Sequence, residues 1–222
     1  MIKVKAHRLA YSPVPKAACS SIKRALAELS PKVNLDKLPV TDPPYDVWHA
    51  VYPTRRFRPH RWETLPIGWF SFTAVRDPFR RLMACYTNRV VERRELRNSP
   101  KLRAGYLGLP VDPDPDFFFT HLAQYREAAS VIKHHASHTW LFTGPKLDVY
   151  AEVYRVEALA DLARDLSAWT ETEVVLHREN TSSTRLSADD LAPATCAALR
   201  PWLAQEYAFL KTFYPDPPFD LH

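Results

Sequence analysis

Short stretches of apolar and β-branched residues alternate along the chain with stretches of helical periodicity. Residues 8–14 and 69–75 have the pattern of strands, and the second, bounded by Gly68 and Pro78, is typical of a buried central strand. Residues 20–29 follow the first strand, with apolar positions spaced for one face of a helix. Because strands and helices alternate, we expect an α/β fold with a mostly parallel sheet.

The rest of the chain continues this alternation. A helix is expected to begin at Pro78, since proline suits the first helical turn, and to end near residue 96. Further helices are predicted at residues 117–127, 128–142, 156–168, 189–199 and 202–213. Strands are predicted within residues 147–154 and at 174–176. No internal repeat is present, and a length of 222 residues fits one sizeable domain or two small ones.

Composition narrows the classes of function. The hydrophobic share of 46% and the charged share of 25% are ordinary globular values and exclude a wholly disordered chain. The 4 glycines exclude a glycine-rich phosphate loop, and the 3 cysteines contain no CxxC pair, which disfavours a zinc ribbon. The net charge of +5 suits an anionic ligand but is too small to indicate nucleic acid by itself.

Targeting signals are not visible in the sequence. No run of residues approaches the roughly 18 apolar positions of a membrane span. The residues after Met1 lack the apolar stretch of a signal peptide, so a cytoplasmic location is expected.

The turn between the first strand and its helix is the first segment with chemistry. The opening N–H groups of a helix have no internal partner and bind phosphate or sulfate readily. The small side chains of Ala17 and Ala18 let an anion reach the backbone, Lys16 adds a full charge, and Ser20 and Ser21 add hydroxyl donors. The alternative is that Ser20 merely caps a helix. The turn lacks the glycines of G-x-x-x-x-G-K-[ST], so an ordinary ATP or GTP loop is disfavoured.

Arg76 is the second candidate. It follows a buried strand and precedes a helix, a position that points into the crevice where open α/β sheets bind ligands. Its guanidinium can hold a phosphate with paired donors. The alternative is an ion pair with Asp77 or with a neighbouring helix.

Together the two segments resemble those of the sulfotransferases that use 3′-phosphoadenosine 5′-phosphosulfate (PAPS), in particular the carbohydrate-type branch. Residues 15–21 match that family's P-K-x-x-x-[ST]-x turn, and residues 75–82 match its V-R-[DN]-P-[FY]-x-R-L segment. Weaker similarities follow in the same order, at residues 133–140, 154–159, 177–182 and 207–215. The resemblance covers about residues 8–215.

The resemblance implies a P-loop-NTPase-like three-layer α/β/α fold with a central, mostly parallel sheet. It also implies that residues 1–222 form a single sulfotransferase-like domain, in which residues 31–66 are an irregular segment on the acceptor side. It implies an enzyme that moves the sulfuryl group from PAPS to a hydroxyl group, expected to be that of a saccharide. PAPS is then the co-substrate and 3′-phosphoadenosine 5′-phosphate (PAP) the product. Neither a metal nor a nucleic acid is expected to take part.

The resemblance also implies roles for individual residues. The backbone of residues 17–21 holds the 5′-phosphate, and Lys16 stabilises the negative charge that grows on the bridging oxygen. Arg76 binds the 3′-phosphate of the donor. The implied cofactor-binding residues are Lys16, Ala17, Ala18, Cys19, Ser20, Ser21, Arg76, Ala84, Arg178 and Ser182.

Ala84 departs from the family pattern, which usually has a serine there as a second ligand of the 3′-phosphate. Either Arg80, Arg81 or another group compensates, or binding is weaker, or the chain is a non-catalytic nucleotide-binding relative. His138 stands where the family often has glutamine, and no mechanism is attached to it.

Sulfuryl transfer needs a base for the acceptor's proton, and His49 has the right place in chain order and a suitable pKa as a residue type. The alternative is a structural histidine in an aromatic cluster, and His134 and His138 are the substitutes. A metal site built from His134, His135 and His138 lacks the spacing of a known zinc motif and is disfavoured.

Three other functions remain open at this stage. Arginines interleave with aromatic residues around residues 55–62, which suits an acidic saccharide but equally a solvated basic face. A basic module for nucleic acid or polyanions would lose affinity steeply with salt. A nucleotide kinase with a variant loop would need magnesium ligands that the strand ends do not offer. A non-catalytic relative would bind nucleotide only.

Overall fold

The computed structural model describes residues 1–179 and 185–221, which form parts of two compact units. Unit 1 consists of Met1–Arg76 and Thr139–Thr181, and unit 2 of Asp77–His138 and Ser182–His222. Within the described residues no helix is both long and apolar enough to cross a lipid bilayer.

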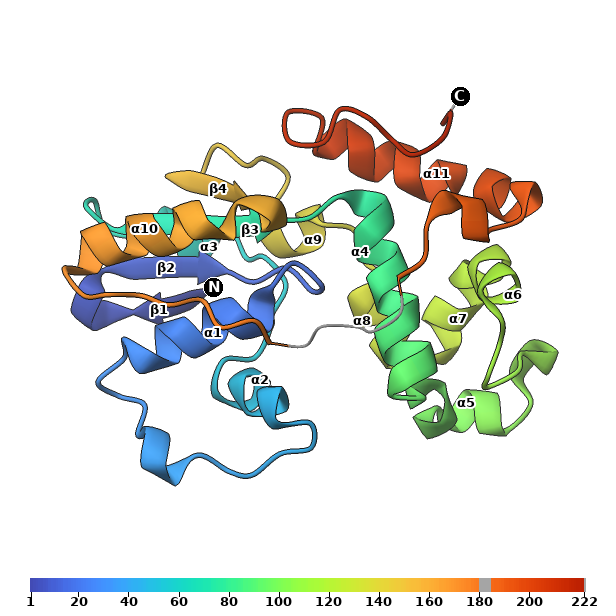
Figure 1. Ribbon diagram of the computed structural model, residues 1–222, viewed down its shortest axis with the longest axis horizontal. Helices are drawn as coiled ribbons and strands as arrows, with labels where there is room; N and C mark the ends of the chain where they lie inside the picture. The colour runs from blue at the N-terminus through green and yellow to red at the C-terminus, as the bar shows by residue number, and fades with distance from the viewer. Residues whose placement is uncertain (180–184, 222) are drawn as a thin grey trace. The chain divides into compact units, whose positions relative to one another are not determined.

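Unit 1 contains a four-stranded sheet in the order β1-β2-β3-β4 (Figure 1). The strands are β1 (Ile2–Val4), β2 (Leu9–Ser12), β3 (Phe70–Val75) and β4 (Glu152–Arg155). β1 runs antiparallel to β2, whereas β2, β3 and β4 are parallel. The α/β class and the mostly parallel sheet are therefore confirmed, as are the strands expected around residues 8–14 and 69–75. β1 was not expected.

The core of unit 1 joins one face of the sheet to two helices, α1 (Cys19–Glu28) and α10 (Leu159–Thr170). Tyr11 of β2 and its partner Phe72 of β3 stack with ring centroids 5.0 Å apart. Both are fully buried in one cluster with Ile22 of α1 and Leu162 of α10, so the two helices cover the same face (Figure 1). Burying each such side chain stabilises the fold by about 1.5–3 kcal/mol.

The opposite face of the sheet carries the short helix α9 (Trp140–Thr143). Ser12, one position beyond Tyr11 and so on the other face, donates its hydroxyl hydrogen to the carbonyl oxygen of Phe142 at 2.7 Å. This single-turn helix does not establish the three-layer arrangement that the resemblance implies.

Residues 31–66 contain little regular structure. Their helical turns are η2 (Leu35–Lys37), η3 (Pro44–Asp46), α2 (Val47–Val51) and α3 (His60–Glu63). The other 3₁₀ turns of unit 1 are η1 (Lys5–His7) and η7 (Val156–Ala158).

The regular elements in the described part of unit 2 are all helices or helical turns (Figure 1). The α-helices are α4 (Pro78–Cys85), α5 (Pro100–Arg103), α6 (Pro115–Thr120), α7 (Leu122–Ala128), α8 (Ser130–His135) and α11 (Pro193–Phe209). α4 continues into the π-helical segment η4 (Tyr86–Glu92), and three 3₁₀ turns follow: η5 (Glu95–Asn98), η6 (Tyr106–Gly108) and η8 (Ala188–Asp190). Asp77 caps α4 by accepting a hydrogen bond from the Arg80 amide at 2.8 Å, and Pro78 opens the helix as expected.

Three local predictions are wrong. Residues 174–176 are not a strand: the Val174 amide bonds to the Ser167 hydroxyl at 2.9 Å, and Val175 is exposed. The two helices expected at 189–199 and 202–213 are one helix, α11, which runs through Pro201. Buried side chains on both sides of that proline, Leu199 and Trp202 among them, hold the helix together despite the lost backbone bond. The two helices expected over residues 117–142 are broken into four shorter ones.

A fully buried ion pair ties two helices of unit 2 together. Arg81 of α4 donates to Glu206 of α11 at 2.8 Å, and both side chains are excluded from solvent. Arg81 also donates to the Ser137 carbonyl at 2.8 Å, and its guanidinium lies 5.3 Å from the ring centre of Trp202. His138 approaches the other oxygen of Glu206 at 3.2 Å. The carboxylate and the guanidinium are thus neutralised where water cannot solvate them.

We predict that Glu206→Gln strongly destabilises unit 2, because it leaves the Arg81 charge buried without a counter-ion. Breaking one partner of a buried pair costs about 3–5 kcal/mol. Urea unfolding monitored by tryptophan fluorescence and circular dichroism measures the change. The matched control is Asp112→Asn, which breaks the exposed pair of Arg97 with Asp112 and is expected to shift the midpoint far less. Equal shifts for the two variants would contradict the assignment.

Candidate functional site

The loop between β2 and α1 holds two residues in a backbone conformation that side chains disfavour. Lys16 has φ +64° and Ala18 has φ +55°, both in the left-handed region, although neither is glycine. The Ala17 amide closes the turn by donating to the Val14 carbonyl at 3.2 Å. Ala17 is buried in a cluster with Val14 and Phe142, and this packing holds the loop in place. Strain of this kind persists where the surrounding structure over-determines the backbone, often at binding sites.

Helix α1 begins without a capping side chain. Its N-cap residue is Ala18, which carries no acceptor group, whereas Ser, Thr, Asp and Asn are the residues that usually cap a helix. The serine cap that we considered as the alternative is therefore not present, since Ser20 lies inside the helix. Helix α1 has 10 residues, and its start, with an alanine N-cap and the nearby Lys16, can bind an anion.

Arg76 meets this loop. Its Nη1 donates to the backbone carbonyl oxygen of Lys16 at 3.2 Å. The contact follows from the sheet: β2 and β3 are parallel neighbours, so their carboxyl ends lie at the same edge, and the Thr73 hydroxyl adds a bond to the Ser12 carbonyl at 2.8 Å. The two segments that the sequence singled out, 60 residues apart, therefore come together.

His49 approaches the same helix from α2. Its Nε2 lies 2.9 Å from the Ser20 hydroxyl oxygen, and its Nδ1 lies 3.0 Å from the Lys23 ammonium nitrogen. Lys23 also donates to the Thr54 hydroxyl at 2.7 Å. The alternative for His49 was a structural residue of an aromatic cluster. Its two ring nitrogens instead contact the polar groups of Ser20 and Lys23.

Lys23 is the functional candidate that the sequence analysis missed. Its side chain is fully buried, and burial lowers the pKa of its ammonium to about 8, an effect that Cys19 partly opposes. A signal was present in the sequence: Lys23 stands three residues after Ser20, which places the two side chains on the same side of the helix.

The segment that contains Arg178 also reaches α1. The Glu179 amide donates to the Ser21 hydroxyl at 3.3 Å, and the Glu179 carboxylate pairs with Arg24 at 2.7 Å. Arg178 itself is exposed beside this contact. Ser182 lies outside the described residues. The structure therefore brings the Arg178 segment to Ser21 in the first turn of α1, while the roles of Arg178 and Ser182 stay predictions.

Ala84 and the substitute histidines belong to unit 2. Ala84 is half-buried in α4, and its part in donor binding stays a prediction. His138 stacks on Trp202 with ring centroids 5.2 Å apart and contacts Glu206, so it has a structural role in that unit. His134 lies edge-on to His135 at 4.9 Å. Across residues 1–179 and 185–221, no three His, Cys, Asp or Glu side chains gather as metal ligands.

The arginine-rich stretch of unit 1 is held down by its aromatic residues. Phe57 and Trp62 stack with centroids 6.0 Å apart, and Trp62 meets Tyr150 edge-on at 4.7 Å. A side chain at Gly144 would come within 2.8 Å of the Phe57 ring, so glycine is required there. The arginines that remain exposed on this stretch are Arg55, Arg56 and Arg58. We call these three arginines the basic edge, and the aromatic base is the stacked pair of Phe57 and Trp62 in the same stretch.

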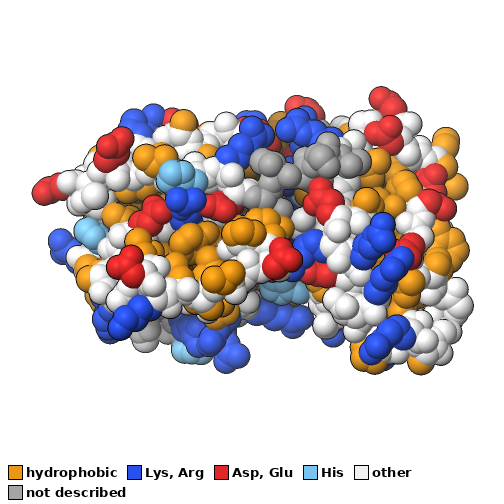
Figure 2. Space-filling model, turned by 60° about the horizontal axis from the view of Figure 1, so that its bottom comes forward, with side chains coloured by type: hydrophobic (Ala, Val, Ile, Leu, Met, Phe, Trp, Pro, Cys, Tyr) orange, Lys and Arg blue, Asp and Glu red, His pale blue; other side chains and the backbone are white. Residues whose placement is uncertain are grey.

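Basic side chains are not gathered into one field on the face that Figure 2 presents. Lys and Arg occur there in several groups, with acidic and apolar side chains between them. A polyanion-binding module usually shows a continuous basic stripe. Among the described residues, no such stripe is visible on the face that Figure 2 presents.

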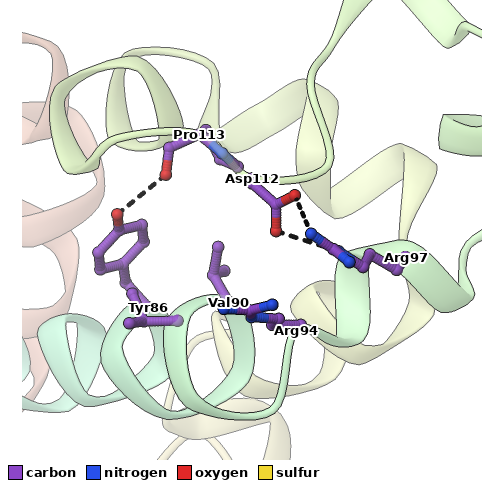
Figure 3. Close-up of a pocket in the computed structure, with 7 residues that line it drawn as sticks. Tyr86, Val90, Arg94, Arg97, Asp112 and Pro113 are labelled. Carbon is purple, nitrogen blue, oxygen red and sulfur yellow. Dashed lines mark hydrogen bonds and ion pairs between the residues drawn. The ribbon is translucent and has the colours of Figure 1, made fainter.

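A cavity of about 300 Å³ lies in unit 2, and none of its lining residues is among the predicted site residues (Figure 3). Tyr86, Val90, Arg94 and Asp112 are among its lining residues. Its polar groups bond across it: the Tyr86 hydroxyl donates to the Pro113 carbonyl at 2.9 Å, and Arg97 pairs with Asp112. Because these hydrogen-bonding and charged groups are paired with one another, we assign no catalytic or binding role to the cavity.

The described features are those of an α/β protein whose candidate ligand site lies at the carboxyl ends of parallel strands. The sequence model of the sulfotransferase family matches residues 1–199 of the chain, so the chain belongs to the sulfotransferase family. The resemblance found in the sequence is confirmed, and family membership supports sulfotransferase activity in general. Searches of curated proteins and of solved structures found no match.

We predict that Ala18→Gly and Ala18→Val have opposite effects. A left-handed residue with a Cβ costs about 1–2 kcal/mol, which glycine removes, less about 0.5–1 kcal/mol for its greater freedom in the unfolded chain. The glycine variant is therefore expected to be as stable as the wild type or slightly more so. The β-branched valine is expected to destabilise the protein and to weaken anion binding. Thermal unfolding with and without pyrophosphate measures both, and a valine variant that matches the wild type would contradict the loop geometry.

Proposed function

We propose that the protein transfers the sulfuryl group of PAPS to a hydroxyl group of a carbohydrate acceptor, as a single enzyme domain without a metal. The observation that carries the proposal is the contact between Arg76 and the Lys16 carbonyl at 3.2 Å. It joins the two most specific motifs of the chain at one edge of the sheet. PAPS carries one phosphate at the 3′ position and another at the 5′ position of its ribose. It therefore needs two positively charged groups, for which Arg76 and the loop of Lys16 are proposed.

The proposed role of the loop is to hold the 5′-phosphosulfate. The N–H groups that open α1 lie at the positive end of the helix dipole, and the Ser20 and Ser21 hydroxyls lie in the first turn of α1. Lys16 would sit at the oxygen that bridges phosphorus and sulfur. As the S–O bond breaks, its electron pair remains on that oxygen, so the ammonium stabilises the transition state more than the bound donor.

The proposed role of Arg76 is to bind the 3′-phosphate. A guanidinium has five N–H donors in a fixed fork, and the bond to Lys16 uses one of them. That bond fixes the side chain against the loop, so its distance from the helix start is set before the donor binds. A 3′-phosphate is what distinguishes PAPS and PAP from ATP.

The proposed proton acceptor is His49. Its ring lies beside the first turn of α1, where the sulfuryl group would be transferred, and its Nε2 lies 2.9 Å from the Ser20 hydroxyl of that turn. The acceptor hydroxyl would lose its proton to the ring as its oxygen attacks sulfur. The basic edge of Arg55, Arg56 and Arg58 on its aromatic base favours a saccharide acceptor that carries negative charge.

We predict that PAP binds far more tightly than adenosine 5′-phosphate. A charge-assisted hydrogen bond contributes about 1.5–3 kcal/mol, so the 3′-phosphate is expected to improve the dissociation constant about 10- to 100-fold. Arg76→Ala is expected to abolish that preference and to leave binding of adenosine 5′-phosphate nearly unchanged. Isothermal titration calorimetry measures all four constants. Equal affinities of the wild type for the two nucleotides would remove Arg76 from the donor site.

We predict that Lys16→Ala lowers kcat for sulfuryl transfer about 10²- to 10³-fold, the typical loss when one stabilising donor is removed from a developing charge. PAP binding is expected to weaken much less. The measurement is transfer of radiolabelled sulfate from PAPS to an acceptor library. The control is Lys5→Ala, which removes an exposed lysine of the same unit and is expected to leave kcat unchanged. A wild type that binds PAP and transfers nothing would identify a non-catalytic relative, the outcome that Ala84 keeps open.

A further inference from the structure

Lys23 is a buried cation whose contacts carry no negative charge. Its side chain is 0% exposed, in the middle of α1. Its ammonium contacts Nδ1 of His49 at 3.0 Å and the Thr54 hydroxyl at 2.7 Å. A buried ammonium is costly unless it is paired. A lysine that served only to stabilise the fold would be expected to meet a carboxylate, as Arg81 does in unit 2.

The charged form of Lys23 fixes the proton of His49. An ammonium has three donors and no acceptor, so Nδ1 of His49 must accept its hydrogen bond. The neutral ring then carries its hydrogen on Nε2, which donates to the Ser20 hydroxyl oxygen 2.9 Å away. In this state neither ring nitrogen offers a lone pair to an acceptor hydroxyl.

The neutral form of Lys23 reverses this arrangement. An uncharged amine nitrogen has a lone pair and can accept from Nδ1–H across the same 3.0 Å. The ring hydrogen then resides on Nδ1, and Nε2 presents its lone pair toward the first turn of α1. The two forms differ by one proton and need no movement of the backbone.

We propose that Lys23 and His49 form one proton-accepting pair, in which Lys23 is a positioning residue that decides whether Nε2 of His49 can take the acceptor's proton. This inference rests on the proposed function and adds to it a residue and a direction of proton flow.

The proton flow balances in a single transfer. The acceptor O–H bond breaks and its proton passes to Nε2 of His49, while the acceptor oxygen forms its bond to sulfur. The Nδ1 proton passes to Nζ of Lys23 and restores the ammonium. The S–O bond to the bridging oxygen breaks, and its electron pair leaves with PAP. The pair returns to its accepting form when Nε2 of His49 loses its proton to solvent and Lys23 passes one proton back to Nδ1, a net release of one proton.

The groups around Lys23 allow this exchange near neutral pH. The titratable groups that act on its ammonium are Cys19 from its own helix and His49 from α2, and Thr54 contributes a neutral hydroxyl. Burial lowers the pKa of Lys23 to about 8 from its ordinary 10.5. The accepting form of the pair therefore gains population as the pH rises through about 8. A histidine that acted alone would instead become competent above about 6.5.

The pH dependence of kcat/KM for PAPS-dependent transfer tests the proposal. The wild type is expected to gain activity with an apparent pKa near 8. Lys23→Met removes the ammonium that holds Nδ1, so its activity is expected to rise at the ordinary histidine value of about 6.5. Lys23→Arg cannot lose its proton and holds Nε2 protonated, so it is expected to lose about 10²-fold or more at every pH, the scale of a missing general base. A Met variant with the wild-type profile, or an Arg variant with wild-type activity, would overturn the proposal.

Nitrogen-15 NMR of the wild type gives a readout that does not depend on turnover. With His49→Asn to assign the ring, His49 is expected to carry its hydrogen on Nε2 below pH 8 and on Nδ1 above it. A ring that keeps one tautomer across this range refutes the pair even if sulfuryl transfer is observed. Conversely, a tautomer exchange in a protein that does not bind PAP would support the pair and refute the proposed function.

Discussion

The parallel pairing of β2 with β3 is the constraint on which the candidate site depends. Parallel neighbours end at the same edge, so whatever follows each strand in the sequence meets there. After β2 comes the loop of Lys16, and after β3 comes Arg76, whose guanidinium bonds to the Lys16 carbonyl. The stacked rings of Tyr11 and Phe72 hold this register from within the core. An error of one residue in that register would turn both rings to the other face.

The strongest local patterns predicted the elements that carry the site. The β-branched, aromatic run before Arg76 and the apolar face after Ser20 are both long enough for their periodicity to decide between strand and helix. The contact between Arg76 and the loop could also be anticipated, because it follows from strand order. The same reasoning placed His49 near the acceptor only through the family resemblance, and its polar partners could not be read from the sequence.

Predictions were wrong where tertiary contacts outweigh local propensity. Pro201 normally interrupts a helix, yet α11 continues past it because Trp202 and Leu203 are buried in the core of unit 2. Residues 174–176 have a strand's composition, but Ser167 captures the Val174 amide. Lys23 was overlooked for a related reason: a lysine in a helix normally reaches solvent, and its burial depends on α2, a segment with little periodicity of its own.

The absence of glycine from the loop has a consequence for how a ligand is received. A glycine-rich loop reaches left-handed geometry without strain but samples many shapes before it closes on a phosphate. Here Lys16 and Ala18 adopt that geometry despite the steric cost of their Cβ atoms, and the buried side chain of Ala17 holds the loop in this conformation. The loop has therefore given up most of its conformational entropy during folding, and an arriving anion meets a receptor that is already shaped.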